Sequence, residues 1–507
     1  MIEIPPRFAG RPPVSLLHSR QGAKKRELDL EREWPGATGL AEDVRYYGAW
    51  MREEAQKRIG HLYPPVEITA EMAKERPDLR PLVGKSLIVV AWLWARTVKS
   101  PNPAFSHVDV PLASGFILCG KEGKEAYVEP VVKGEHYSFI VKMGRPPSDA
   151  EDGTKATGRG ASFRCIVSNA PVGGDYIKAE GQAGRLDAKL MAVVAESALG
   201  RIYLSPTEEI EAIAKKARPT WRPSGDVPAR LTGGTCVPYG LKEWGDLFTP
   251  RQLVALTTFS DLVSEAKAQI LDHAIAANMA DDGLGIDASG SGATAYAEAI
   301  CVYLAFCIDK MADTNTCLCS WQIDPPRLRA TFGRQALPMV WDFAEANVFG
   351  DAAGDFARCV QSLIEVLQRL GEQHAKGTAY QQDAASLEGQ SQPVISTDPP
   401  YYNNIAYADL SDFFYVWLRR TLRPVFPSLL ATIAVPKVEE LVATPHRHGS
   451  KENAEAFFLS GMTEAMRRIA IASNRAFPIT IYYAFKQSET KADGGTSSTG
   501  WVTFLDA

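Results

Sequence analysis

The stretch Ile395–Asn404, which reads ISTDPPYYNN, is the one around which the chain is organised. A short apolar run ends at Asp398, and two prolines follow it. Proline fixes its own φ and biases the residue before it toward extended backbone, so the sequence predicts a buried strand that ends in a rigid turn. Because neither proline carries an N–H group, Asp398 and the Pro399 carbonyl remain as acceptors for an amino group.

Aromatic side chains follow the turn directly, at Tyr401 and Tyr402. Tyr401 offers a flat ring against which a base can stack. Acceptors beside an aromatic ring suit the exocyclic amine of a nucleobase that has been swung out of its helix. A strand followed by an ordinary proline turn is the alternative interpretation.

Composition places the chain among ordinary proteins of the cytoplasm. It has 507 residues, enough for about two or three domains, with 45% hydrophobic and 23% charged residues. Its formal net charge is −5, so any contact with DNA depends on local basic surface. The 8 cysteines are scattered, which is typical of a reducing compartment. The longest apolar run, residues 86–95, is too short to cross a bilayer, and no signal peptide is recognisable, so we expect a cytoplasmic protein without a membrane partner.

Periodicity predicts an α/β protein with four segments. Residues 1–97 hold a helix and a buried strand, 98–185 form a small β-rich module, 186–375 are mainly helical, and 376–507 return to an α/β pattern. The expected helices are 40–61, 186–199, 207–217, 249–279, 294–313, 333–347, 355–374, 409–420 and 451–472. The expected strands are 86–97, 137–142, 163–167, 378–380, 394–397 and 477–485.

Two groups of basic residues are candidates for contacts with phosphate. One surrounds Trp221, and its members are Lys215, Lys216, Arg218 and Arg222. The other lies near residue 420, and its members are Arg419, Arg420 and Arg423. In both groups a solvated linker or helix face is the alternative to phosphate contact.

The Asp-Pro-Pro-Tyr motif at residues 398–401 resembles the catalytic motif of the amino-directed DNA methyltransferases, which use S-adenosylmethionine to methylate N6 of adenine or N4 of cytosine. Together with residues 407–420, YADLSDFFYVWLRR, it resembles one bacterial and archaeal family of large adenine-specific DNA methylases. Members of that family carry a zinc ribbon and an N-terminal domain of unknown function. Further similar stretches are residues 2–14, 92–112, 158–192, 239–263, 331–347 and 477–507.

The resemblance implies a fold and a set of site residues. Residues 376–507 would hold part of a Rossmann-like methyltransferase sheet, and 186–375 would be a large helical insertion that recognises the target sequence. The implied catalytic residues are Asp398, Pro399, Pro400 and Tyr401. Asp383 and Ala384 would contact the adenine of S-adenosylmethionine, while Tyr402 and Asn403 would shape the base pocket. For Asp383, a turn-capping role is the alternative.

Two departures from the family pattern qualify that expectation. The four zinc-ligand positions of the family are Ser100, Phe105, Cys165 and Ser168 here, so we expect a degenerate zinc ribbon without metal. The glycine loop that anchors the cofactor is also not recognisable, because Phe8-Ala9-Gly10 is followed by Arg11-Pro12-Pro13. We therefore expect an incomplete form, truncated at both ends, whose cofactor loop a separate polypeptide supplies. The alternative is a non-catalytic DNA-binding remnant or a partner-dependent subunit of a restriction-modification or phage-defence system.

Overall fold

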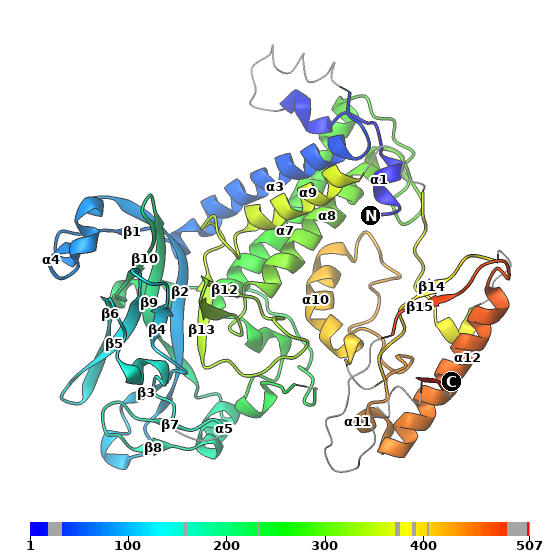
Figure 1. The fold of residues 1–507 in the computed structure, drawn as a ribbon. Helices are drawn as coiled ribbons and strands as arrows, with labels where there is room; N and C mark the ends of the chain where they lie inside the picture. Colours follow the sequence, from blue (N-terminus) through cyan, green and yellow to red (C-terminus); the bar gives the residue numbers. More distant parts are fainter. Residues whose placement is uncertain are drawn as a thin grey trace. The chain divides into compact units, whose positions relative to one another are not determined.

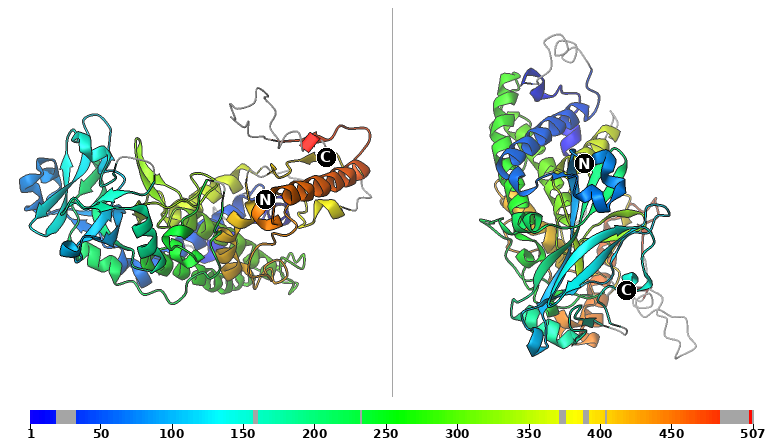
Figure 2. Two further views of the ribbon diagram at one scale, coloured as in Figure 1. Left: turned by 90° about the horizontal axis from the view of Figure 1, so that it is seen from below. Right: turned by 90° about the vertical axis from the view of Figure 1, so that its left-hand side faces the viewer.

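The computed structural model describes residues 1–18, 33–156, 160–231, 233–370, 376–387, 392–402, 405–483 and 504–505 (Figures 1 and 2). These residues form two compact units of a mixed α/β protein. The larger unit comprises Met1–Ala229, Thr235–Gly377 and Val416–Ala431. The smaller unit comprises Arg230–Gly234, Thr378–Tyr415 and Thr432–Ala507.

One long strand, β2 (Ser86–Lys99), organises the sheet of the larger unit. It is buried along almost its whole length, which explains why its sequence is a continuous apolar run instead of an alternating one. The predicted strand at 86–97 is thus confirmed. The strands of this antiparallel sheet follow the order β1-β2-β9-β10, and β3 and β13 also pair with β2. Their bounds are Val66–Glu67 (β1), Asp109–Leu112 (β3), Asp187–Ser197 (β9), Gly200–Leu204 (β10) and Asp342–Ala346 (β13).

Smaller sheets surround this one. The three-stranded sheet β4-β5-β6 shares an apolar core with β2 and β9, built from side chains such as Leu93, Phe116 and Phe139. The strands predicted at 137–142 and 163–167 correspond to β6 and β7. The bounds are Ile117–Cys119 (β4), Ala126–Lys133 (β5), His136–Met143 (β6), Phe163–Arg164 (β7), Pro171–Val172 (β8), Ser320–Ile323 (β11) and Pro326–Arg329 (β12).

Four long helices pack together beside the sheet, α3, α7, α8 and α9 (Figure 1). Helix α8 is apolar on nearly all sides and is buried among its neighbours. Thr249 accepts a hydrogen bond from the Gln252 N–H and so caps α7. The helices of the larger unit are α1 (Ile4–Arg7), α3 (Thr38–Ile59), α4 (Met72–Glu75), α5 (Gly174–Gln182), α6 (Glu208–Lys215), α7 (Pro250–Ala276), α8 (Ala293–Asp313) and α9 (Phe356–Arg369). Its 3-10 turns are η1 (Val14–His18), η2 (Gly60–Leu62), η3 (Pro77–Leu82), η4 (Pro103–Phe105), η5 (Ser148–Glu151), η6 (Val237–Tyr239) and η7 (Trp244–Leu247).

Three of the predicted elements are wrong. Residues 186–199 are not a helix, because β9 pairs with β2 and β10 on its two sides and long-range pairing overrides the local preference of an Ala- and Leu-rich run. Residues 333–347 are not a helix either, since Pro338 lies in the middle and residues 342–346 form β13. Residues 378–380 form no strand. The sheet therefore takes strands from each of the segments 1–97, 98–185 and 186–375.

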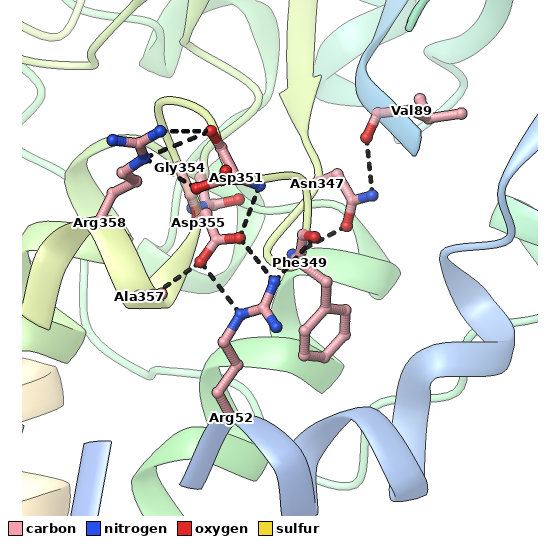
Figure 3. A network of polar contacts seen from close by, with 10 residues as sticks. Arg52, Val89, Asn347, Phe349, Asp351, Gly354, Asp355, Ala357 and Arg358 are labelled. Carbon is pink, nitrogen blue, oxygen red and sulfur yellow. Dashed lines mark hydrogen bonds and ion pairs between the residues drawn. The ribbon is translucent and has the colours of Figure 1, made fainter. Parts of the chain in front are cut away.

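A buried aspartate joins α3, α9 and the loop after β13 (Figure 3). Asp355 is 0% exposed, and its carboxylate accepts from the Ala357 N–H at 2.6 Å, which caps α9. The Asp351 N–H donates at 2.8 Å, and Arg52 of α3 pairs with the same carboxylate at 3.0 Å. Arg52 also donates to the Phe349 carbonyl at 2.9 Å. This network fixes where α9 begins.

The smaller unit contains short strands and two longer helices. Strand β14 pairs with β15 in parallel, and Ser450 caps α12 by accepting from the Asn453 N–H. A small apolar core forms around Tyr402, Phe458 and Met462. The elements are η8 (Ala384–Ser386), β14 (Ser396–Thr397), α10 (Tyr407–Leu422), α11 (Pro445–His448), α12 (Lys451–Ala472) and β15 (Thr480–Ile481). Residues Tyr407–Tyr415 of α10 belong to this unit, and the rest of the helix belongs to the larger one.

Candidate functional site

The Asp-Pro-Pro-Tyr motif begins directly after β14, at the carboxyl end of a parallel strand. The Thr480 N–H donates to the Ile395 carbonyl at 3.0 Å, and the Tyr482 N–H donates to the Thr397 carbonyl at 2.8 Å, so β15 holds the strand up to the motif. The prediction that this strand is buried is wrong, because Val394 is 62% exposed. Within the described residues β14 has one partner strand, and so little apolar surface covers it.

Asp398 is exposed and shares a hydrogen bond within its own turn. The Tyr401 hydroxyl donates to Asp398 Oδ1 at 2.6 Å. This bond raises the pKa of Tyr401, because ionisation of the phenol would place two negative charges together. Asp398 Oδ2 accepts no hydrogen bond from the part of the chain that the structure describes. The site thus has one occupied and one open carboxylate oxygen.

The ring of Tyr401 lies beside a second aromatic side chain. Its centroid is 5.5 Å from that of Tyr483, at an interplanar angle of 81°. Tyr483 in turn stacks on Phe504 at 3.9 Å, and burial raises the pKa of Tyr483 to about 12. The sequence did not lead us to connect Tyr483 or Phe504 with the motif. The available signal was that Tyr483 follows β15 by two positions.

Tyr402 turns into the core of the smaller unit. Its φ is 48°, its hydroxyl donates to Glu455 Oε1 at 2.6 Å, and its ring contacts Phe458 edge-on at 5.4 Å. Burial and, to a smaller extent, the bond to Glu455 raise the pKa of Tyr402. The structure therefore separates two consecutive tyrosines, with Tyr401 beside the exposed carboxylate and Tyr402 packed inside. Asn403 lies outside the described residues.

Asp383 caps the 3-10 turn η8. Its Oδ1 accepts from the Ala385 N–H at 3.0 Å, and Ala384 is the first residue of the turn. Both residues are exposed. Asp383 Oδ1 therefore has the turn-capping role that was the alternative interpretation of the sequence. Asp383 Oδ2 has no hydrogen-bond partner among the described residues.

Buried ion pairs hold the helix that follows the motif. Arg447 donates to Asp409 at 2.6 Å and to Glu440 at 2.7 Å. Lys437 donates to Asp412 at 2.6 Å. Because Asp409 and Asp412 are buried on α10, these pairs fix its first turns against the loop that follows it. Two acidic residues at i, i+3 spacing in an aromatic-rich helix were the sequence signal for these positions, and it was not recognised.

The four zinc-ligand positions of the resembled family come together in the β-rich region. The Ser168 N–H donates to Cys165 Sγ at 3.4 Å, and Phe105 packs in the same apolar cluster as Cys165. Burial alone would raise the pKa of the Cys165 thiol, but hydrogen bonds from Ser168 and Ser100 outweigh it and lower that pKa. Among the described residues, no three His, Cys, Asp or Glu side chains gather in a way that could hold a metal ion.

Comparison with known proteins returns no match to a family model, to a curated protein or to a solved structure. In the described part of the chain, no helix is both long and apolar enough to span a bilayer.

Proposed function

We propose that the chain carries the base-handling part of an S-adenosylmethionine-dependent DNA methyltransferase that acts on an exocyclic amino group, N6 of adenine. The observation that carries the proposal is the exposed Asp398 at the carboxyl end of a parallel strand. Its Oδ2 is open, and two prolines follow it in the sequence. Ligand sites in α/β proteins lie at this end of parallel strands.

The chemistry follows from the nature of the target amine. Its lone pair is delocalised into the base, which makes it a poor nucleophile. Asp398 Oδ2 and the Pro399 carbonyl would accept its two hydrogens and so localise the lone pair on nitrogen. The Tyr401 ring beside them would stack on the extruded base, an interaction worth on the order of 1–3 kcal/mol.

S-adenosylmethionine would supply the electrophilic methyl group. The donor set fits this cofactor only in part. Asp383 keeps one open carboxylate oxygen for its adenine or ribose, whereas the glycine loop that would present backbone N–H groups to its methionine carboxylate is not recognisable in the sequence. The parallel pair β14-β15 is compatible with a piece of a Rossmann-like sheet, and the cluster around Cys165 with a degenerate zinc ribbon.

A second candidate is a non-catalytic DNA-binding remnant or a partner-dependent subunit of a restriction or phage-defence system. It is favoured by two bonds: the Tyr401 hydroxyl already occupies Asp398 Oδ1, and Asp383 Oδ1 already caps its own turn. In that case a partner would have to contribute the cofactor-binding donors.

Two measurements separate these candidates. Calorimetric titration with S-adenosylmethionine tests whether the chain alone binds the cofactor, and transfer of a labelled methyl group to duplex DNA tests activity. For an enzyme we expect saturable binding and transfer to adenine, with Asp398→Asn lowering the transfer rate on the order of 100-fold or more. Glu464→Gln, at an exposed carboxylate on α12, is the matched control and should change the rate less than twofold by the same reasoning.

A chain that binds no cofactor and transfers no methyl group, but recovers both when a partner polypeptide is added, would establish the second candidate. Full transfer by Asp398→Asn would remove the motif from the mechanism.

A further inference from the structure

The larger unit contains an arginine-lined pocket of about 550 Å³, whereas the Asp398 motif belongs to the smaller unit. It is formed by the last turns of α10, the residues after them and one tryptophan from the linker before α7; its lining includes Trp221, Arg419, Arg420, Arg423, Pro424 and Pro427. This volume lies within the range of sites for organic ligands and is large for a single inorganic anion.

The pocket carries an excess of positive charge. Three guanidinium groups line it, and one carboxylate compensates them: Asp261 of α7 pairs with Arg420 at 2.6 Å. Arg419 and Arg423 are four residues apart, so they lie on the same face of the helical stretch, and neither has an ion-pair partner in the described residues. The Nε–H groups of Arg419 and Arg420 are buried and donate to nothing in those residues. Like charges held together without counter-charges favour an anionic ligand.

Aromatic packing holds the wall of the pocket in place. The Arg420 guanidinium lies over the Trp221 ring, 4.4 Å from its centroid. Trp221 meets the buried Trp417 edge-on at 5.3 Å, and Trp417 meets Phe248 at 5.4 Å. The arginines therefore project from a packed surface, and Pro424 and Pro427 add an apolar floor suited to a sugar or base.

The basic group predicted around residue 220 contrasts with this pocket. Lys215 pairs with Glu211 at 3.0 Å, and Arg222 pairs with Glu243 at 2.9 Å and with Asp246 at 2.8 Å. The charges of Lys215 and Arg222 are thus compensated by acidic side chains, and Arg218 donates to the carbonyls of Lys215 and Ala217. From that linker, Trp221 is the residue that reaches the arginine pocket.

We propose that the pocket of Trp221, Arg419, Arg420 and Arg423 binds phosphodiester groups of a DNA strand and positions that strand. Unpaired arginines bind backbone phosphates, and the proline and tryptophan surfaces accommodate the attached nucleoside. The choice of DNA as the phosphate source rests on the function proposed above, whereas the affinity for phosphodiesters follows from the pocket.

The test is the binding of a fluorescent duplex oligonucleotide to the full chain, measured by anisotropy over a range of salt concentrations. Arg419→Gln combined with Arg423→Gln should weaken binding at low salt on the order of tenfold and reduce the slope of log K against log salt by about 2, since two phosphate contacts are lost. The matched control combines Arg58→Gln with Arg185→Gln, which removes the same charge from exposed arginines that are paired with Glu265 and Glu180. We expect the control to keep the wild-type slope.

A second variant works in the opposite direction and does not depend on losing a side chain from the pocket wall. Asp261 is 56% exposed, so Asp261→Asn should leave the fold intact and free Arg420 for the ligand. Binding should become tighter by several-fold. Unchanged or weaker binding by this variant, or an equal loss in the double variant and its control, would overturn the proposal.

Competitors identify the source of the phosphate. Unlabelled duplex should displace the probe, whereas inorganic phosphate or poly-glutamate at the same charge concentration should not; displacement by either would overturn the assignment to DNA. If the chain transfers no methyl group but the double variant still loses DNA binding, the pocket stands and the proposed enzyme activity fails. If instead the chain transfers a methyl group and the double variant binds DNA like the wild type, the proposed enzyme activity stands and the proposed role of the pocket fails.

Discussion

Asp355 in the larger unit and Asp398 in the smaller unit each accept a hydrogen bond from a residue close by in sequence, yet their surroundings differ. Asp355 is fully buried and receives donors from two backbone N–H groups and from Arg52, so both of its oxygens are satisfied by the chain. Asp398 is exposed and has a bond from Tyr401 on one oxygen alone. A carboxylate whose two oxygens both accept hydrogen bonds from the protein stabilises the fold, whereas a carboxylate with one open oxygen can accept a hydrogen bond from a ligand.

The largest effect that this comparison predicts is on stability at Asp355. Asp355→Ala removes the cap of α9 and leaves Arg52 without its carboxylate partner, so it should lower the free energy of unfolding by about 3–5 kcal/mol. Urea unfolding followed by tryptophan fluorescence measures the loss. Asp351→Asn, which removes the charge of an exposed partner of Arg358 and keeps a side chain that tolerates the φ of 51° at this position, is the control and should cost less than about 1 kcal/mol. Equal losses in the two variants would show that burial of the carboxylate is not what matters.

A second buried carboxylate, Asp43, should make stability depend on pH. Its oxygens accept from the Val14 and Ser15 N–H groups and from the Tyr296 hydroxyl, but burial dominates and raises its pKa from 3.8 to about 6. A raised pKa favours the folded state at low pH, and this contribution is lost as the pH rises through 6. The free energy of unfolding of the wild type, relative to Asp43→Asn, should therefore fall by about 2 kcal/mol between about pH 4 and pH 7.

The measurement is a set of urea unfolding curves across that pH range. Asp175→Asn, at a fully exposed side chain, is the control and should stay parallel to the wild type. A difference between wild type and Asp43→Asn that is constant with pH would contradict the raised pKa.

A smaller effect is expected at the exposed pair of Asp398 and Tyr401. Because the carboxylate of Asp398 raises the pKa of Tyr401, Asp398→Asn should return that pKa toward the ordinary value of about 10. The titration of Tyr401 can be followed by NMR with labelled tyrosine, and Tyr401→Phe assigns the signal. We expect no measurable change in the unfolding midpoint for either variant, since both side chains are accessible to water. A shift of the pKa away from 10 in Asp398→Asn would show that the two groups are not paired in solution.

The smallest effect is expected from a chelator. Cys165 is the one thiol among the four zinc-ligand positions, and its sulfur accepts hydrogen bonds from Ser168, Val167 and Ser100 of the same chain. Removing metal with EDTA should therefore leave the thermal unfolding midpoint unchanged, and elemental analysis should find no stoichiometric zinc. A downward shift of the midpoint with EDTA would mean that the cluster holds a metal after all.

Local signals in the sequence predicted much of the fold. The apolar stripes within residues 249–279 and 451–472 predicted α7 and α12, and the continuous apolar run predicted β2, because these elements follow from residues close together in the chain. Strand β9 was mistaken for a helix because its partners β2 and β10 define it, and β2 lies far away in sequence.

The candidate site divides in the same way. The rigid turn after β14 follows from the two prolines of the motif. The hydrogen bond between Asp398 and Tyr401 was not predicted, although the two residues are three positions apart. The contacts of Tyr401 with Tyr483, of Tyr402 with Glu455, and of Trp221 with Arg420 join residues that are distant in sequence. No pattern within a short window contains that information, so the aromatic neighbours and the arginine pocket could be found only from the structure.

The left-handed backbone of Tyr402 has a consequence for how the motif tolerates change. A tyrosine at a φ of 48° is strained, and glycine or asparagine would relieve that strain at the backbone. Either substitution would, however, remove the ring that anchors the turn to Phe458 and Glu455. Relief of the backbone strain and retention of the ring contacts thus impose opposite requirements on position 402. Because Tyr401 is the adjacent residue, the outcome at position 402 also determines the orientation of Tyr401.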